Sequence, residues 1–342
     1  MTTGESRPVV LVERRVAASI EDLLGGATER LAMATADSKS GARFERVWID
    51  GRPHVLKHLH VDDDWIMRST GDLGCRPVQV WRSGILDQLP ACIDHAVVGA
   101  AAGLGRNGWG GALLMRDLSA SLVPEGNGPV RLDQHLAFLD HMAALHARFW
   151  GWTDTVGLAP PHHRYLEFSP EGVSVEAARG WPDPVPPLII EGWKQLATIG
   201  GSIAAPVIDL AHDPSPLVDA LETSPATLLH GDWKLGNLGS LPDGRTVLLD
   251  WAVPGRGCPT AELAWYLAIN AARLPHTKEA AIAAYRAALE RHGVATSTWW
   301  DRALALSLLG GLVQFGWEKA LGGPGAELAW WLGRGADGLD CL

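Results

Sequence analysis

Short apolar runs separated by turns dominate roughly the first hundred residues of the chain. The runs 31–36 (LAMATA), 44–49 (FERVWI) and 54–59 (HVLKHL) each have the length of a strand, and Asp50-Gly51 separates the second from the third. An Asp-Gly pair between two apolar runs is a strong signal for a β-hairpin. The pattern therefore predicts a β-rich N-terminal part.

From Asp133 onward, apolar residues recur at helical spacing, and Asp133 itself is available as an N-cap. The residues that would share one face of this helix are Leu136, Leu139, Met142, Leu145 and Phe149. The proline-rich stretch 160–190 is expected to be irregular. Further helices are expected over 192–199, 262–274, 279–293 and 303–317, and strands with loops are expected over 228–240 and 246–252. A mainly helical C-terminal part follows the β-rich one, so we expect an α+β protein.

Length, composition and charge limit the classes of protein to which the chain can belong. A chain of 342 residues suggests two lobes, and 47% hydrophobic residues exclude a largely disordered chain. A net charge of −10 argues against a nucleic-acid partner. The four cysteines form no C-x-x-C pair, which favours a reducing compartment. We see no signal-peptide plan at the start, and the run 303–317 is too short to span a bilayer, so we expect a cytoplasmic protein without a membrane partner.

The most informative stretch for function is His230-Gly231-Asp232-Trp233-Lys234-Leu235-Gly236-Asn237. It is followed by Asp250 at the end of an apolar run. Phosphoryl transfer needs metal ions, oxygen ligands that hold them, and a group that positions the attacking hydroxyl. Mg²⁺ prefers oxygen ligands, and Asn237 and Asp250 are of the right type. Asp232 could orient a hydroxyl while Lys234 reaches the transferring phosphate. An accidental polar turn beside a strand-end aspartate is the plain alternative.

This order of residues resembles the aminoglycoside phosphotransferase family, whose fold is similar to that of protein kinases. Asp232, Asn237 and Asp250 match the order of the kinase catalytic Asp, the Asn five residues later and the metal-binding Asp. The His-Gly-Asp opening and the segments 143–150 (AALHARFW) and 255–268 (GRGCPTAELAWYLA) are similar to the small-molecule branch. The resemblance implies a two-lobed, protein-kinase-like α+β fold with a β-rich N-lobe (1–113), an inter-lobe strip (114–118) and a mainly helical C-lobe (119–342).

The resemblance also implies roles for single residues. Asp232 would be the catalytic base, Lys234 would stabilise the γ-phosphate, and Asn237 and Asp250 would hold Mg²⁺ beside the nucleotide. His230 would support the loop, and Glu262 would hold the loop backbone. The nucleotide site would be formed by Lys57, by Ser38 and Ser40 in the loop over the phosphates, and by Met115 in the strip 114–116 that reads the purine.

The sequence departs from the family at the partner of Lys57. The family places a glutamate on the helix after the lysine strand, whereas no glutamate occurs between Lys57 and Pro90. An aspartate could substitute, the helix could be displaced, or phosphates alone could position Lys57. His58, His60 and Asp62 could alternatively form part of a metal site, although an acidic loop after a strand is the commoner arrangement.

Two functions follow. The first is transfer of the γ-phosphate of ATP or GTP to a hydroxyl of an antibiotic, of aminoglycoside or nucleoside type, or of a related metabolite, as in a resistance enzyme. The second is a catalytically impaired, kinase-like module that binds a nucleotide or a partner. No obligatory protein partner is implied. A polycationic acceptor would need several converging carboxylates, for which the candidates are Glu167, Glu171, Glu176, Glu191 and Asp209. The abundance of tryptophan favours a less charged acceptor.

Overall fold

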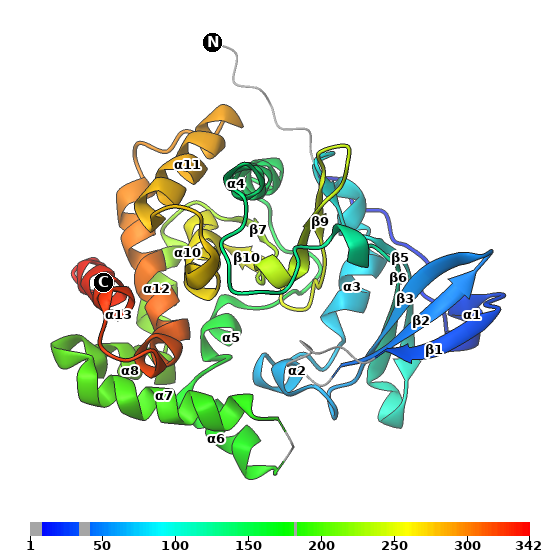
Figure 1. Cartoon of the computed structure of the whole chain (residues 1–342), viewed down its shortest axis with the longest axis horizontal. Coiled ribbons are helices and arrows are strands. Elements are labelled where there is room, and N and C mark those ends of the chain that lie inside the picture. Colours follow the sequence, from blue (N-terminus) through cyan, green and yellow to red (C-terminus); the bar gives the residue numbers. More distant parts are fainter. Residues whose placement is uncertain (1–8, 34–41, 181–182) are drawn as a thin grey trace.

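A computed structural model describes residues 9–33, 42–180 and 183–342 and divides them into two lobes (Figure 1). A five-stranded sheet forms the N-lobe, on the right of Figure 1, and helices form most of the C-lobe on the left. Ser38 and Ser40, expected over the phosphates, lie outside the described residues.

The N-lobe sheet is antiparallel, with the strand order β1-β2-β3-β6-β5. Its strands are β1 (Glu29–Met33), β2 (Arg43–Ile49), β3 (Arg52–Leu59), β5 (Val97–Leu104) and β6 (Gly110–Arg116). The predicted hairpin is confirmed: Asp50 and Gly51 join β2 to β3 with positive φ angles of 50° and 69°. Such angles match the turn type that fits the twist of two paired strands.

The two faces of this sheet pack against different partners. Leu56, Ala112 and Leu114 pack with helix α1 (Ile20–Leu24) in a small core of their own. Leu113 and Met115 belong to the main hydrophobic core, on the side of helix α3 (Arg76–Ser83). Because successive residues of a strand face opposite ways, Lys57 lies on the face opposite Leu56.

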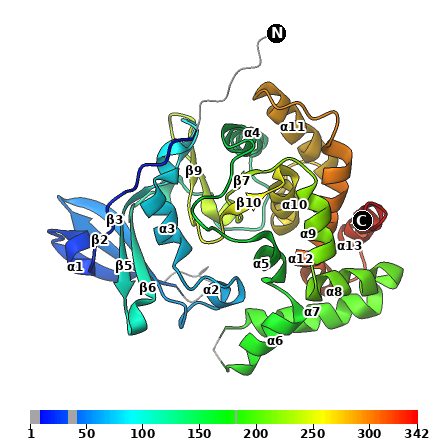
Figure 2. The same ribbon diagram turned by 180° about the vertical axis from the view of Figure 1, so that it is seen from behind.

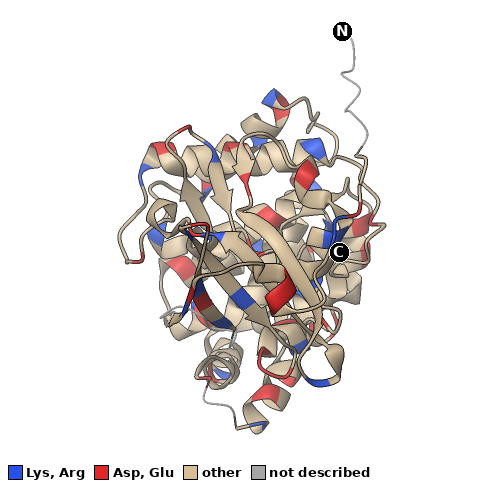
Figure 3. Ribbon diagram, turned by 90° about the vertical axis from the view of Figure 1, so that its right-hand side faces the viewer, with Lys and Arg blue, Asp and Glu red and all other residues tan. Residues whose placement is uncertain are grey.

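Charged side chains pair across neighbouring strands of the N-lobe. Arg30 of β1 lies 2.8 Å from Glu45 of β2, and Glu45 lies 2.7 Å from His58 of β3. Figure 3, which looks onto this side of the molecule, shows acidic and basic residues interspersed there. Cross-strand side-chain pairs of this kind, ionic or hydrogen-bonded, stabilise an antiparallel sheet. They also occupy His58, one of the side chains of the alternative metal site.

Ion pairs and a short sheet tie the two lobes together. Strand β4 (Ile93–Asp94) pairs in parallel with β9 (Thr246–Leu248), which in turn pairs with β8 (Leu238–Ser240). Asp94 also forms ion pairs with Arg116, at the end of β6, and with Arg245 beside β9. The predicted inter-lobe strip 114–118 overlaps the N-lobe sheet, because strand β6 continues to Arg116.

The C-lobe consists of packed helices around the strands that carry the loop 230–237. Its longer helices are α4 (Leu132–Arg148), α7 (Val185–Ile199), α10 (Pro259–Ile269), α11 (Lys278–Arg291), α12 (Trp300–Leu321) and α13 (Ala326–Leu339). Its shorter helices are α5 (Pro161–Leu166), α6 (Pro170–Ala178), α8 (Ala204–His212) and α9 (Ser215–Glu222), and α2 (Trp65–Ser69) faces α6 from the N-lobe. Strands β7 (Thr227–Leu229) and β10 (Gly255–Gly257) pair beneath the loop.

Two sequence predictions in the C-lobe are wrong. Helix α4 begins one residue before Asp133, so Arg131 and not Asp133 is the N-cap, and Leu136 is 40% exposed instead of lying on the buried face. The stretch 160–190 is helical in α5, α6 and the first part of α7. Prolines there occupy the first turn of each helix, where no intrahelical partner is needed for the missing N–H. Proline thus starts helices in this stretch.

The apolar run 303–317 lies inside α12, most of whose residues are buried among its neighbours, as predicted. Within the described ranges, we find no helix that combines the length and apolarity needed to cross a membrane.

Candidate active site

The loop 230–237 is held from below by buried side chains. His230 is fully buried, and its Nε2 donates a hydrogen bond to the carbonyl oxygen of Leu249 at 3.0 Å. Its ring packs edge-on against Trp251 with 4.6 Å between ring centroids, and Trp233 is also completely buried. Burial lowers the pKa of His230, which favours the neutral ring that this hydrogen bond needs. The loop therefore has a rigid base, and two of the sixteen tryptophans help to form it.

Glu262 fixes the start of the loop through its two carboxylate oxygens. Oε1 accepts from the backbone N–H of Gly231 at 2.6 Å, and Oε2 accepts from the N–H of His230 at 3.1 Å and from Nε2 of His146 at 2.9 Å. Burial would raise the pKa of Glu262, but the hydrogen bond and charge of His146 outweigh it and lower the pKa. The carboxylate therefore stays ionised where three donors meet it.

We expect Glu262→Gln to lower the free energy of unfolding by about 2–4 kcal/mol. The amide has one acceptor oxygen for three donors, and its own NH₂ group would face one of them without a partner. Urea unfolding of the native protein and of Glu262→Gln measures the difference in the free energy of unfolding. The exposed Glu125→Gln is the matched control. Equal stability of the two variants would contradict the role of Glu262 in holding the loop.

Asp232, Lys234 and Asn237 contact one another within the loop. The Lys234 ammonium lies 2.8 Å from Oδ2 of Asp232, and Nδ2 of Asn237 donates to the same oxygen at 2.9 Å. Asn237 Nδ2 also donates to the backbone oxygen of Asp232 at 2.9 Å. The other carboxylate oxygen, Oδ1, is buried and has no hydrogen-bond partner among the described residues. One carboxylate oxygen of Asp232 is thus fixed by two donors, and the other is not.

Lys57 finds its partner on the opposite lobe. Its ammonium donates to Oδ1 of Asp250 at 2.6 Å, and the Lys57 side chain is only 8% exposed. Three of the aspartates between Lys57 and Pro90 have other partners: Asp64 caps α2, Asp72 accepts from the N–H of Arg76, and Asp87 pairs with Arg14. The missing glutamate is therefore replaced by an aspartate 193 positions further along the chain, which no spacing rule would have found.

Asp250 has an unusual backbone conformation. Its φ angle is +63°, a left-handed value that is uncommon for a residue other than glycine and that clusters at functional sites. Burial would raise the pKa of Asp250, but the charges of Lys57 and Lys234 outweigh it and lower the pKa. The carboxylate is therefore ionised between two lysines that come from different lobes.

Asn237 and Asp250 fit the ligand preferences of Mg²⁺. The Asn237 amide directs its nitrogen to Asp232, which leaves its carbonyl oxygen for a metal, and Asp250 supplies a carboxylate. Mg²⁺ commonly takes one or two protein oxygens and completes its shell with water and phosphate. Among the described residues, no three His, Cys, Asp or Glu side chains cluster as a metal site, so water and phosphate oxygens would supply the other ligands.

Arg164, on α5, was not predicted as part of the site. Its guanidinium donates to the backbone oxygen of Gly231, pairs with Glu167 and stacks on the ring of Trp265 at 3.6 Å from the centroid. Burial lowers its pKa to about 10, although the negative charges of Asp232 and Glu262 act in the opposite direction. Arg164 lies in the stretch 160–190, for which the sequence predicts irregular structure, and no sequence motif indicates a functional role for it.

Met115, the residue expected at the purine, lies on the core face of β6 and is 8% exposed. Its strand pairs with β3 on one side and β5 on the other, and the N–H of Arg116 already donates to the oxygen of Ala96 at 2.9 Å. The role of Met115 in nucleotide binding stays a prediction, as do the roles of the other site residues.

No protein-family model and no curated protein sequence matches the chain. Among solved structures, a microcompartment-associated aminopropanol kinase is 14% identical, covers 94% of this chain and 92% of its own, and has a TM-score of 0.50. The choline kinase LicA from Streptococcus pneumoniae is 12% identical over 92% of this chain and 94% of its own, with a TM-score of 0.49. A thermostable aminoglycoside phosphotransferase APH(4)-Ia, bound to ADP and hygromycin B, is 15% identical over 93% of this chain and 95% of its own, with a TM-score of 0.47.

The likeness to the aminopropanol kinase shows the fold. It confirms the predicted two-lobed, protein-kinase-like α+β architecture.

Proposed function

We propose that this protein is a small-molecule O-phosphotransferase that moves the γ-phosphate of a purine nucleoside triphosphate to an alcohol. The proposal rests on one observation: side chains from both lobes converge at a single point. Asp232, Lys234 and Asn237 of the loop meet there, and Lys57 of the N-lobe reaches Asp250 beside them.

In the proposed reaction, Asp232 orients the acceptor hydroxyl with the oxygen that has no protein partner. The acceptor oxygen forms a bond to the γ-phosphorus as the bond from that phosphorus to the β-phosphate oxygen breaks. The hydroxyl proton passes to Oδ1 of Asp232, and the nucleoside diphosphate leaves. Lys234 and Asn237 hold Oδ2 and so keep the carboxylate in the orientation that the transfer needs.

The two lysines and the metal ion that Asn237 and Asp250 would hold would neutralise the charge of the phosphates. Lys57 would exchange Asp250 for the α- and β-phosphates when a nucleotide binds, and Lys234 would approach the γ-phosphate. Asn237 and Asp250 would hold Mg²⁺, which when bound supplies positive charge to the phosphate oxygens. Stabilisation of this kind accounts for most of the rate enhancement in phosphoryl transfer.

The donor and the acceptor are less closely defined. ATP and GTP carry the same phosphates and would differ only at the purine, next to the end of β6. The proposed acceptor is a hydroxyl of an antibiotic or a related metabolite, which would make the protein a resistance enzyme.

A nucleotide-binding module without catalysis is the second candidate. The missing helix glutamate favours it. Against it stand the ionised Asp250 paired with Lys57 and the buried, unpartnered oxygen of Asp232, neither of which a simple binding module needs.

Release of nucleoside diphosphate from Mg·ATP and Mg·GTP tests the proposal, with aminoglycosides, nucleoside antibiotics and simple sugars as acceptors. We expect release that depends on an acceptor, together with a phosphorylated product detected by mass. Binding of the nucleotide with no transfer to any acceptor would support the second candidate.

A further inference from the structure

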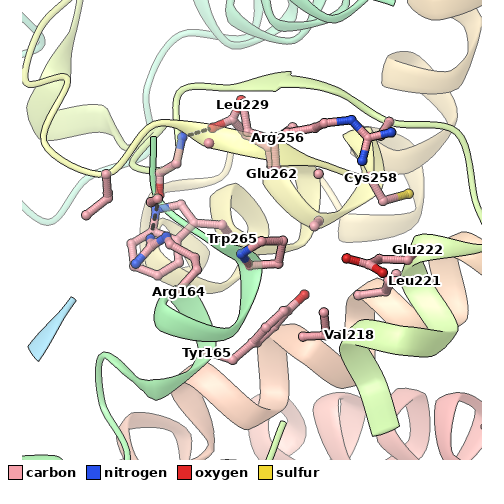
Figure 4. Close-up of a pocket in the computed structure, with 18 of the residues that line it drawn as sticks. Arg164, Tyr165, Val218, Leu221, Glu222, Leu229, Arg256, Cys258, Glu262 and Trp265 are labelled. Atoms are coloured by element: carbon pink, nitrogen blue, oxygen red, sulfur yellow. Dashed lines mark hydrogen bonds between the residues drawn. The ribbon is translucent and has the colours of Figure 1, made fainter. Parts of the chain in front are cut away.

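A cavity lies in the C-lobe directly behind the start of the catalytic loop (Figure 4). Helices α5, α9 and α10 and strand β10 surround it, and Figure 2 shows α9 on the outer side of this region. It contains about 780 Å³ of space not filled by atoms, part of which is open to solvent. Gly231, the residue before Asp232, forms part of its wall.

Most of the cavity wall is apolar, with Val218, Leu221, Leu229 and Trp265 among its residues. Two polar groups point into the space in Figure 4, the hydroxyl of Tyr165 and the carboxylate of Glu222. Burial raises the pKa of Tyr165, so its hydroxyl stays protonated and can donate. An apolar wall with a few inward polar groups is typical of a site for a small organic molecule.

The charges around the cavity do not favour a cation. Arg164 of α5 and Arg256 of β10 both line it. The carboxylate of Glu262, also in the wall, already accepts from His146 and from two backbone N–H groups. The face of Trp265 that could hold a cationic ligand is covered by Arg164 at 3.6 Å. Glu222 is therefore the carboxylate of the wall that remains for a ligand, and the guanidinium of Arg256 lines the same wall, whereas the charge of Arg164 is paired with Glu167.

Acidic side chains that could have served a polycation are also engaged nearby. Glu167 pairs with Arg164, and Glu176 pairs with both Arg68 and Arg179. Breaking such buried pairs to bind an ammonium group would leave a guanidinium without its counter-ion, which is costly.

We infer that this cavity receives the apolar body of an uncharged, hydroxylated acceptor, and that polycationic acceptors are excluded from it. The inference rests on the proposed function. The acceptor would lie against Val218 and Leu229, hydrogen-bond to Tyr165 and Glu222, and extend past Gly231 so that its hydroxyl reaches Asp232. Arg164 joins the two regions, since it lines the cavity and holds the carbonyl oxygen of Gly231.

Direct binding tests this inference without requiring turnover. Isothermal titration calorimetry measures the affinity of chloramphenicol and phenyl glucoside, which are neutral and carry an apolar ring beside hydroxyls, and of hygromycin B as a polycation. Ala226 and Ala261 line the cavity and are partly exposed, so Ala226→Trp and Ala261→Leu would fill it from two elements. The exposed Ala283→Trp on α11 is the matched control.

We expect at least one neutral probe to bind saturably to the native protein and hygromycin B to bind less tightly. Ala226→Trp should weaken the neutral probe by about tenfold or more, with a smaller loss in Ala261→Leu and none in Ala283→Trp. Affinity for ATP should be the same in all four proteins, which also shows that the variants fold.

Three results would overturn the inference: tighter binding of hygromycin B, binding of the neutral probes that ignores both cavity variants, or no binding of either neutral probe. Phosphorylation of hygromycin B with normal kinetics in Ala226→Trp would reject the inference and leave the proposed function standing. Binding of a neutral probe in the cavity without phosphate transfer to any acceptor would do the reverse.

Discussion

Asp232→Asn should lower kcat by about 10³-fold, at the level usual for loss of a positioned proton acceptor. The amide keeps the size of the side chain and can still contact Lys234 and Asn237, but it cannot take the proton of the acceptor hydroxyl. The affinity for the nucleotide should stay within about threefold, because Asp232 is expected to contact the acceptor and not the phosphates. Acceptor-dependent release of nucleoside diphosphate and titration of the nucleotide measure the two quantities.

The exposed Asp133→Asn is the control for this variant, since it makes the same chemical change where only Arg131 is in contact. A kcat of Asp232→Asn close to the native value would exclude the role of this carboxylate as proton acceptor. A parallel loss of nucleotide affinity would show instead that Asp232 acts on the metal and the phosphates.

Asp250→Asn should lower kcat/KM for the nucleotide by about 10²–10³-fold, because several kcal/mol of charge stabilisation depend on the metal ligand. The substitution removes both the proposed carboxylate ligand of Mg²⁺ and the partner of Lys57 at 2.6 Å. The Mg²⁺ concentration for half-maximal rate should rise as well. Initial rates over a range of Mg²⁺ concentrations at saturating acceptor measure both changes.

Asp243→Asn serves as the control, because Asp243 is an exposed carboxylate that pairs with Arg245 away from the loop. If Asp250→Asn kept the native Mg²⁺ dependence while its rate fell, Asp250 would act by holding Lys57 and not by binding the metal.

The sequence predicted the elements whose signals are local. The Asp50-Gly51 hairpin, the strand of Lys57 and the buried helix at 303–317 are visible from short patterns of polar and apolar residues, and the structure contains all three. Glu262 was expected to hold the loop backbone, and it does so through the N–H groups of His230 and Gly231. These features depend on neighbouring residues or on one recognisable motif.

Long-range contacts could not be predicted in the same way. The partner of Lys57 lies on the other lobe, and Arg164 reaches the loop from a proline-rich stretch that was expected to be irregular. The prolines of that stretch were misread because proline at the first turn of a helix and proline in a loop look alike without a wider context. The pairing of Glu167 and Glu176 with arginines could not be predicted from the sequence either, and the inference about the acceptor uses it.

Tryptophan illustrates the same limit. Its abundance suggested a less charged acceptor without placing any ring. Trp251 packs on His230 beneath the loop. The ring of Trp265 stacks with the guanidinium of Arg164 at the wall of the cavity. Only the packing shows that one ring supports the proposed chemistry and that the other lies where the acceptor is proposed to bind.

Transfer of a radiolabelled γ-phosphate tests the central claim most directly. The native protein, Mg²⁺ and labelled nucleotide are incubated with each acceptor, and the label is followed into nucleotide, inorganic phosphate and acceptor. We predict that the label appears in the acceptor as an ester, that transfer requires Mg²⁺, and that it is lost in Asp232→Asn. Label that remains in the nucleotide with every acceptor, or that appears only as inorganic phosphate, would contradict the account.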